Sequence, residues 1–166
     1  VVYNLYMSNQ QNMNREIERK FLVLLEKFPK NLHYELFRQG YLSTKKERTV
    51  RVRLAGDKGF LTIKGITKGV SRSEDEYEIP KDDAINLIET LCQKPLIEKK
   101  RYKIEHIGHT WEVDEFLGEN KGLWIAEIEL NAEDEKFETP DWLGDEVSHD
   151  SRYFNSSLIS NPFSRW

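Results

Sequence analysis

Residues 16–25 read EIERKFLVLL, a stretch that predicts a β-strand with one charged and one apolar face. Successive side chains point to opposite faces of a strand, so Glu16, Glu18 and Lys20 share one face. Ile17 and Phe21 lie on the other. For one strand taken alone, a charged face exposed to water is the simplest interpretation. The interpretation changes because the pattern recurs.

Similar strand-like segments follow along the chain, and several carry charges of a single sign. Arg51 and Arg53 share one face of a predicted strand, while Glu127 and Glu129 share one face of another. Glycine-containing turns such as 55–59 separate neighbouring segments. Together with the first stretch, the sequence predicts eight strands, at 16–25, 36–44, 49–54, 60–64, 76–79, 97–104, 110–116 and 123–130.

So many short strands favour an antiparallel barrel or sandwich. Their apolar faces need a cover, and we expect helices to supply it. Apolar residues recur at steps of three and four over residues 81–92, which predicts a helix there. Two shorter helices are also predicted. One is acidic and spans 132–137, and the other spans 150–159 and begins at a cap formed by Asp150 or Ser151.

The composition describes a globular protein with a heavy but balanced charge load. The 166 residues are 33% charged, yet the net charge is only −4. This balance argues against nucleic acid as a partner, because proteins that bind nucleic acid usually carry an excess of basic residues. No apolar run reaches the ~20 residues of a membrane span, so we expect a cytoplasmic protein. We expect residues 1–13 to be a flexible extension and 14–166 to be a single domain.

The charged faces suit two kinds of ligand at once. Arginine and lysine bind phosphate oxygens, and carboxylates bind hard divalent cations. Both in one cavity would fit a polyanion that brings its metal with it. An exposed sheet with cross-strand salt bridges, each contributing little, explains the same pattern. Composition and periodicity do not decide between these two interpretations.

Glu16-x-Glu18-x-Lys20 resembles the ExExK signature of the CYTH superfamily, the triphosphate tunnel metalloenzymes. The resemblance runs from Asn14 to about Ile159 and is closest to the short, stand-alone bacterial type. It implies a mainly β (α+β) fold, an eight-stranded antiparallel barrel forming a charged tunnel with a few helices outside. The other segments that resemble the family, in its order, are RQGYLST, VRVRL, LTIKG, SRSEDEYEI, IEKKRY, WEVDEF, AEIEL and LGDEVSHDSRYFN.

The resemblance also implies roles for individual residues. The implied metal ligands, for two Mg²⁺ or Mn²⁺ ions, are Glu16, Glu18, Glu127 and Glu129, with Asp114 as a weaker member. The implied phosphate-binding residues are Lys20, Arg51, Arg53, Lys64, Lys99 and Arg101, with Arg72, expected in a loop, as a weaker member. The implied catalytic residues are Glu16, Glu18, Lys20, Tyr41, Glu76 and Glu78. For Tyr41, a packing role in the barrel is an equally good interpretation.

The activity implied is hydrolysis of a small-molecule triphosphate, with inorganic tripolyphosphate the leading candidate. A metal-activated water would attack a terminal phosphoryl group in line. An adenylate cyclase, or a thiamine or nucleoside triphosphatase, is the alternative within the family. A module that binds polyphosphate without cleaving it is the alternative from another class. The sequence leaves the oligomeric state open, a homodimer included.

Overall fold

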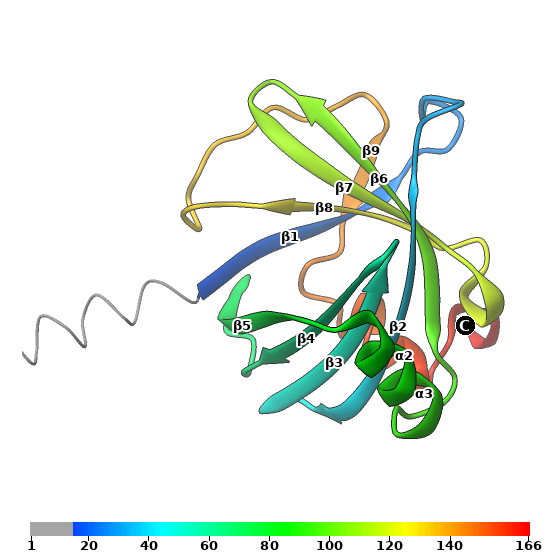
Figure 1. Cartoon of the computed structure of the whole chain (residues 1–166). Helices are drawn as coiled ribbons and strands as arrows, with labels where there is room; N and C mark the ends of the chain where they lie inside the picture. The colour runs from blue at the N-terminus through cyan, green and yellow to red at the C-terminus, as the bar shows by residue number, and fades with distance from the viewer. Residues whose placement is uncertain (1–14) are drawn as a thin grey trace, which may run out of the picture.

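Nine antiparallel strands form one sheet in the computed structural model, which describes residues 15–166. The predicted flexible extension, 1–13, lies outside the described residues. The strand order is β5-β4-β3-β2-β6-β7-β8-β1-β9, and a further pairing of β5 with β1 closes the first eight strands into a ring (Figure 1). The strands are β1 (Arg15–Val23), β2 (Glu35–Lys45), β3 (Arg48–Ala55), β4 (Lys58–Lys64), β5 (Ser71–Ile79), β6 (Ile97–His106), β7 (His109–Phe116), β8 (Trp124–Glu129) and β9 (Leu143–Glu146). The helices are α2 (Lys81–Thr90) and α3 (Ser157–Ser160), with 3-10 turns η1 (Gly118–Asn120), η2 (Ser151–Tyr153) and η3 (Phe163–Arg165).

The strand β1 joins the two ends of the ring. Its first residues pair with β5, with Glu16 opposite Arg72. Its middle pairs with β8, with Glu18 opposite Glu129. The last residues of β1 pair with β9, a strand that the sequence pattern did not predict. The predicted eight-stranded antiparallel ring is therefore confirmed, with β9 added beside β1.

The alternation of side chains places the charges inside the ring and the apolar residues outside it. Helix α2 packs on the outer face of β3 and β4, where Ala84 and Ile88 are fully buried in one cluster with Val52. Around β1, β7 and β8, aromatic side chains from connecting segments form the cover. Trp142 meets Phe28 edge-on at 5.5 Å and Trp111 at 5.9 Å between ring centroids. The expectation that helices cover the apolar faces is confirmed for β3 and β4, which α2 covers. It is wrong for β1, β7 and β8.

Two of the predicted helices are also wrong. Residues 132–137 form a turn and irregular chain, because Phe137 packs edge-on against Phe21 and Trp111 and the Glu135 carboxylate accepts the backbone N–H of Asn131. The predicted terminal helix at 150–159 is split into η2 and α3. Its predicted cap is present, since Asp150 accepts the backbone N–H of Arg152 at 3.0 Å. The helix predicted at 81–92 is confirmed as α2, ending two residues earlier.

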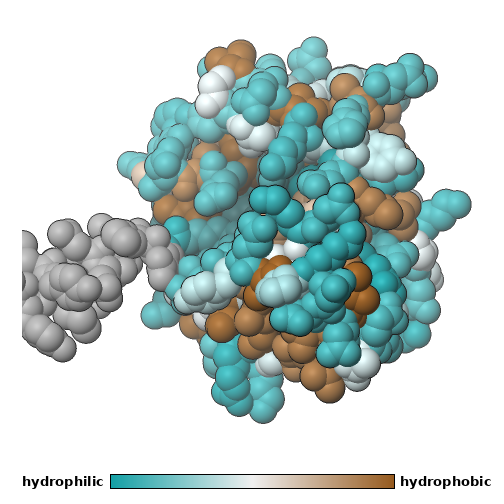
Figure 2. Space-filling view, in the orientation of Figure 1, coloured by the Kyte–Doolittle hydropathy of each residue, from teal (hydrophilic) through white to brown (hydrophobic). Residues whose placement is uncertain are grey.

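Hydrophilic side chains cover much of the molecular face in Figure 2, which is hollowed near its centre. Across residues 15–166 no helix is both long and apolar enough to span a membrane.

Candidate active site

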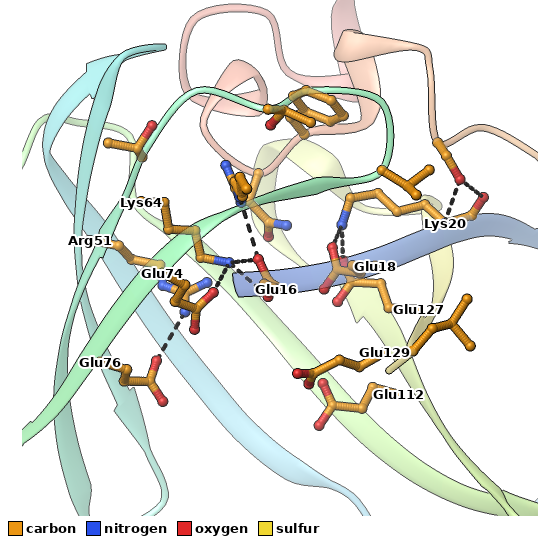
Figure 3. Close-up of a pocket in the computed structure, with 18 of the residues that line it drawn as sticks. Glu16, Glu18, Lys20, Arg51, Lys64, Glu74, Glu76, Glu112, Glu127 and Glu129 are labelled. Carbon is orange, nitrogen blue, oxygen red and sulfur yellow. Dashed lines mark hydrogen bonds and ion pairs between the residues drawn. The ribbon is translucent and has the colours of Figure 1, made fainter. Parts of the chain in front are cut away.

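The inside of the ring is a charged cavity of about 530 Å³. Side chains from β1, β3, β4, β5, β7 and β8 point into it (Figure 3), and Lys99 and Arg101 of β6 also line it. The carboxylates that line it are Glu16, Glu18, Glu74, Glu76, Glu112, Glu127, Glu129 and Glu135. The bases are Lys20, Arg51, Arg53, Lys64, Arg72, Lys99, Arg101 and His109.

The bases of the cavity are held by ion pairs with its carboxylates. The Lys20 ammonium donates to Glu127 at 2.5 Å and to Glu18. The Lys64 ammonium lies 2.8 Å from Glu16 and 2.7 Å from Glu74. These lysines are buried, so each contact is shielded from water and orients its side chain.

One group of carboxylates converges at the β1–β8 junction. Glu18 and Glu129 are directly opposed in neighbouring strands, and so are Glu112 and Glu127. Burial, together with the nearby carboxylates of Glu16 and others, raises the pKa of Glu129. Repulsion of this kind is relieved when a cation binds between the carboxylates.

Glu127 is held in its charged form by its neighbours. Burial alone would raise its pKa, but the Lys20 ammonium and the Arg101 guanidinium outweigh burial and lower it well below its usual range. The same contacts raise the pKa of Lys20 against the effect of burial. Glu127 therefore connects the set of converging carboxylates with the bases Lys20 and Arg101.

The wall from β3 and β6 is strongly basic, and its Arg101 contacts Glu127 of the carboxylate group at 2.9 Å. Burial and the neighbouring Arg51 guanidinium lower the pKa of Arg53 to about 10. Burial, reinforced by Arg101, lowers the pKa of Lys99 to about 8 despite the attraction of Asp114. The Nε atoms of Arg51 and Arg53 are buried without a hydrogen-bond partner. A wall with crowded positive charge is suited to an anion.

Two of the residues implied by the resemblance do not line the cavity. Asp114 is fully buried beneath it and accepts hydrogen bonds from Lys99 at 2.6 Å and Arg101 at 2.7 Å, which leaves it placed as a support for these bases. Glu78 is 58% exposed at the end of β5 and pairs with Lys58. The structure brings the other implied residues together around the cavity.

Arg72 and Tyr41 occupy informative positions. Arg72 is in β5, not in a loop as expected, because the strand begins at Ser71. Its Nε donates to Glu16 at 3.4 Å. Tyr41 is buried opposite Arg51 in the β2–β3 ladder and lines the cavity. Burial raises its pKa, so the tyrosine presents a neutral hydroxyl.

Sequence reasoning missed several residues that line the cavity. Glu74 was overlooked because the fifth strand was predicted to begin at Glu76. Glu112 shares a charged face with Asp114 in the strand predicted at 110–116, but the resemblance gave it no role. Asn155 lines the cavity from the C-terminal segment and accepts from Lys99 at 3.2 Å. The family resemblance of 143–155 pointed to this segment as the closure of one tunnel mouth, but the alternation pattern gave no signal for the contact with Lys99.

The donor set fits a divalent cation that arrives with a phosphate ligand. Carboxylate oxygens are the ligands that Mg²⁺ and Mn²⁺ prefer. Among residues 15–166, no group of three carboxylates, histidines or cysteines is placed to hold a metal by itself. Mg²⁺ is usually bound by one or two carboxylates, with phosphate oxygens and water completing its shell. Glu16, Glu18, Glu127 and Glu129 would provide such partial coordination.

These features define a class of protein, a closed ring of antiparallel strands around a cavity lined by both carboxylates and bases. The CYTH domain family model matches residues 14–160. The chain belongs to the CYTH family, as the resemblance predicted.

Named relatives support this assignment over nearly their whole length. An inorganic triphosphatase from Acetivibrio thermocellus is 54% identical over 91% of this chain and 97% of its own. An inorganic triphosphatase from Nitrosomonas europaea is 38% identical over 86% of this chain and 95% of its own. A solved structure of an inorganic triphosphatase is 35% identical, with a TM-score of 0.62 over 87% of this chain and 93% of that chain.

Proposed function

We propose that the protein is a metal-dependent triphosphatase that hydrolyses inorganic tripolyphosphate to diphosphate and orthophosphate. The observation that carries the proposal is the cavity, whose lining brings a basic wall and a group of converging carboxylates together. The 54% identical relative named inorganic triphosphatase supports the choice of substrate.

The basic wall would bind the phosphate chain. Arg51 and Arg53 line the cavity, and guanidinium groups bind phosphate oxygens in pairs. Lys99 and Arg101, supported from below by Asp114, extend the wall along β6. As negative charge develops on the leaving diphosphate, these fixed cations stabilise it without having to reorganise.

The carboxylates would hold the cation and the attacking water. Glu16 and Glu18 on β1 and Glu127 and Glu129 on β8 are the proposed ligands of Mg²⁺ or Mn²⁺, two ions per site. When bound, such an ion neutralises phosphate charge and lowers the pKa of a coordinated water. A carboxylate that does not bind the ion, such as Glu112, is then available to orient the water. Tyr41, neutral and close to Arg51, would donate a hydrogen bond to a phosphate oxygen.

The test is phosphate release from tripolyphosphate, ATP and thiamine triphosphate, each with Mg²⁺ and with Mn²⁺. We expect tripolyphosphate to be the fastest substrate. Glu18→Gln should reduce kcat by at least about 100-fold, because it removes a charge that acts on the metal and on the transition state. Glu98→Gln is the matched control, since Glu98 lies outside the cavity and pairs with Arg38.

Other outcomes would redirect the proposal. Turnover of ATP alone would favour an organic triphosphate as substrate, and cyclic AMP with diphosphate as products would indicate a cyclase. Tight binding of tripolyphosphate without turnover in either metal would leave a binding module.

A further inference from the structure

Thr62 occupies the centre of the barrel wall beneath the basic side of the cavity. It lies opposite Arg51 on β3 and opposite Glu76 on β5, so the three residues form one row across three strands. Thr62 is fully buried and is not among the residues that line the cavity. Neither the charge pattern nor the family resemblance gives it a role.

The Thr62 hydroxyl bridges the two charged groups of this row. It donates to Glu76 Oε2 at 2.7 Å and accepts from the Arg51 guanidinium at 3.2 Å. Glu76 makes its shortest contact with this neutral hydroxyl. Its contacts to the arginines are longer, 3.4 Å to Arg51 and 3.2 Å to Arg53.

These lengths matter because Glu76 and a phosphate group would compete for the same donors. An unhindered arginine–carboxylate pair closes to about 2.7–2.9 Å, often with two parallel hydrogen bonds. Glu76 does not reach that geometry. The Nε atoms of Arg51 and Arg53 also remain without a partner. Glu76 therefore does not close either guanidinium group into a short bidentate pair, and both side chains line the cavity.

We propose that Thr62 is a positioning residue that holds Glu76 away from close pairing with Arg51 and Arg53, so that both arginines stay available to the phosphate chain. The inference rests on the proposed function, because it assigns those arginines to the substrate. Without the hydroxyl, Glu76 is free to close on the guanidinium groups. Substrate must then displace a tight ion pair, which weakens binding more than it slows the chemical step.

The decisive variant is Thr62→Val, which keeps the shape of the side chain and removes the hydroxyl. We expect KM for tripolyphosphate to rise about tenfold, with kcat within about threefold of wild type. Thr62→Ser restores a hydroxyl at the same place and should return KM to near the wild-type value. A residue that only fills space would show the reverse, because serine removes a methyl group that valine retains.

A second variant tests the competition directly. In Glu76→Gln the competing charge is absent, so adding Thr62→Val should raise KM by less than about twofold. The two substitutions would then be strongly non-additive. Equal effects of Thr62→Val in both backgrounds would overturn the proposal, and so would an unchanged KM in Thr62→Val or a failure of Thr62→Ser to restore KM.

A measurement without turnover separates this inference from the proposed function. Titration calorimetry of tripolyphosphate, in buffer with EDTA, measures anion binding by the metal-free protein. Thr62→Val should weaken this binding about tenfold, and Thr62→Ser should not. If wild type hydrolyses nothing but this difference is present, the proposed function fails and the role of Thr62 stands. If wild type is active and the difference is absent, the role of Thr62 fails alone. Thermal unfolding of each variant checks that it folds.

Discussion

Asp114 shows how a buried charge supports the site without lining it. It is fully enclosed and accepts two hydrogen bonds from Arg101 and one from Lys99. Removing one member of a buried ion network leaves the others uncompensated, and this cost exceeds what the network contributes as a whole. Asp114 therefore contributes to the stability of the fold although it does not line the cavity.

We predict that Asp114→Asn lowers the free energy of unfolding by about 3 kcal/mol. Two buried bases, Lys99 and Arg101, would then face a neutral amide. Urea unfolding followed by tryptophan fluorescence measures the change. Glu98→Gln is the control and should shift the stability by less than about 0.5 kcal/mol, because its ion pair is exposed. Equal stabilities of the two variants would contradict the assignment of Asp114 as a support.

For individual residues, the sequence predicts the residue type and the face of the strand. It does not predict whether a side chain on that face lies in the cavity or at the end of the barrel. Glu76 and Glu78 share a face of β5, yet Glu76 contacts Arg53 in the cavity while Glu78 reaches solvent beside Lys58. Glu112 and Asp114 also share a face, and only Glu112 lines the cavity. Alternation has a period of two and carries no information on where along the barrel a strand position lies. The tilt and register of the closed sheet decide that.

Individual elements divide into those that shape the site and those that only cover the sheet. Helix α2 buries Ala84 and Ile88 on the outer face of β3 and β4. The C-terminal segment does more, because Leu158 and Ile159 of α3 pack into the cluster around Tyr41 and Phe116. Phe154, Asn155 and Ser156, which line the cavity, directly precede α3.

This difference can be tested with two matched cavity-creating substitutions. Ile88→Ala and Leu158→Ala each remove a fully buried aliphatic side chain, and each should cost about 2–5 kcal/mol of stability. Leu158→Ala should also raise KM for tripolyphosphate several-fold, because it loosens the segment that places Asn155 against Lys99. Ile88→Ala should leave KM unchanged at a temperature where both variants are folded. Equal KM values would show that the C-terminal segment does not contribute to the site.

The elements that the sequence predicted are those with a clear period. The eight ring strands and α2 repeat every two residues or every three to four, and the ends of α2 were within two residues of the prediction. The strand β9 has four residues, Leu143–Glu146, and contains Gly144, so it shows no alternation. The false helix at 132–137 had suitable residue types, but tertiary packing of Phe137 on Trp111 overrides such local preference.

The whole molecule holds balanced charge inside its ring. Lys20, Lys64 and Arg101 each contact at least one carboxylate. An anion that binds alone must take these bases from their carboxylates and leave the carboxylates unpaired. A cation that binds the carboxylates at the same time removes this cost. Anion and cation should therefore bind cooperatively.

We predict that the two ligands together stabilise the fold by more than the sum of their separate effects. A methylene-bridged triphosphate analogue with Mg²⁺ should raise Tm by about 5 °C or more at 100 times its Kd. Either component alone, at the same concentration, should raise Tm by less than about 1 °C. Differential scanning calorimetry of the wild-type chain gives the three values. Additive shifts would show that the internal ion pairs do not couple the two ligands.

The pairing of β1 also has a consequence for the order in which the chain can fold during synthesis. This strand is synthesised before its partner β8, which follows about a hundred residues later: Lys20 and Glu127 are 107 positions apart. Until then its apolar side and open edges are available to other nascent chains. Charges within such a strand oppose intermolecular pairing. The charges of Glu16, Glu18 and Lys20 would therefore oppose pairing of the unfinished chain with its neighbours, in addition to their proposed role in the finished site.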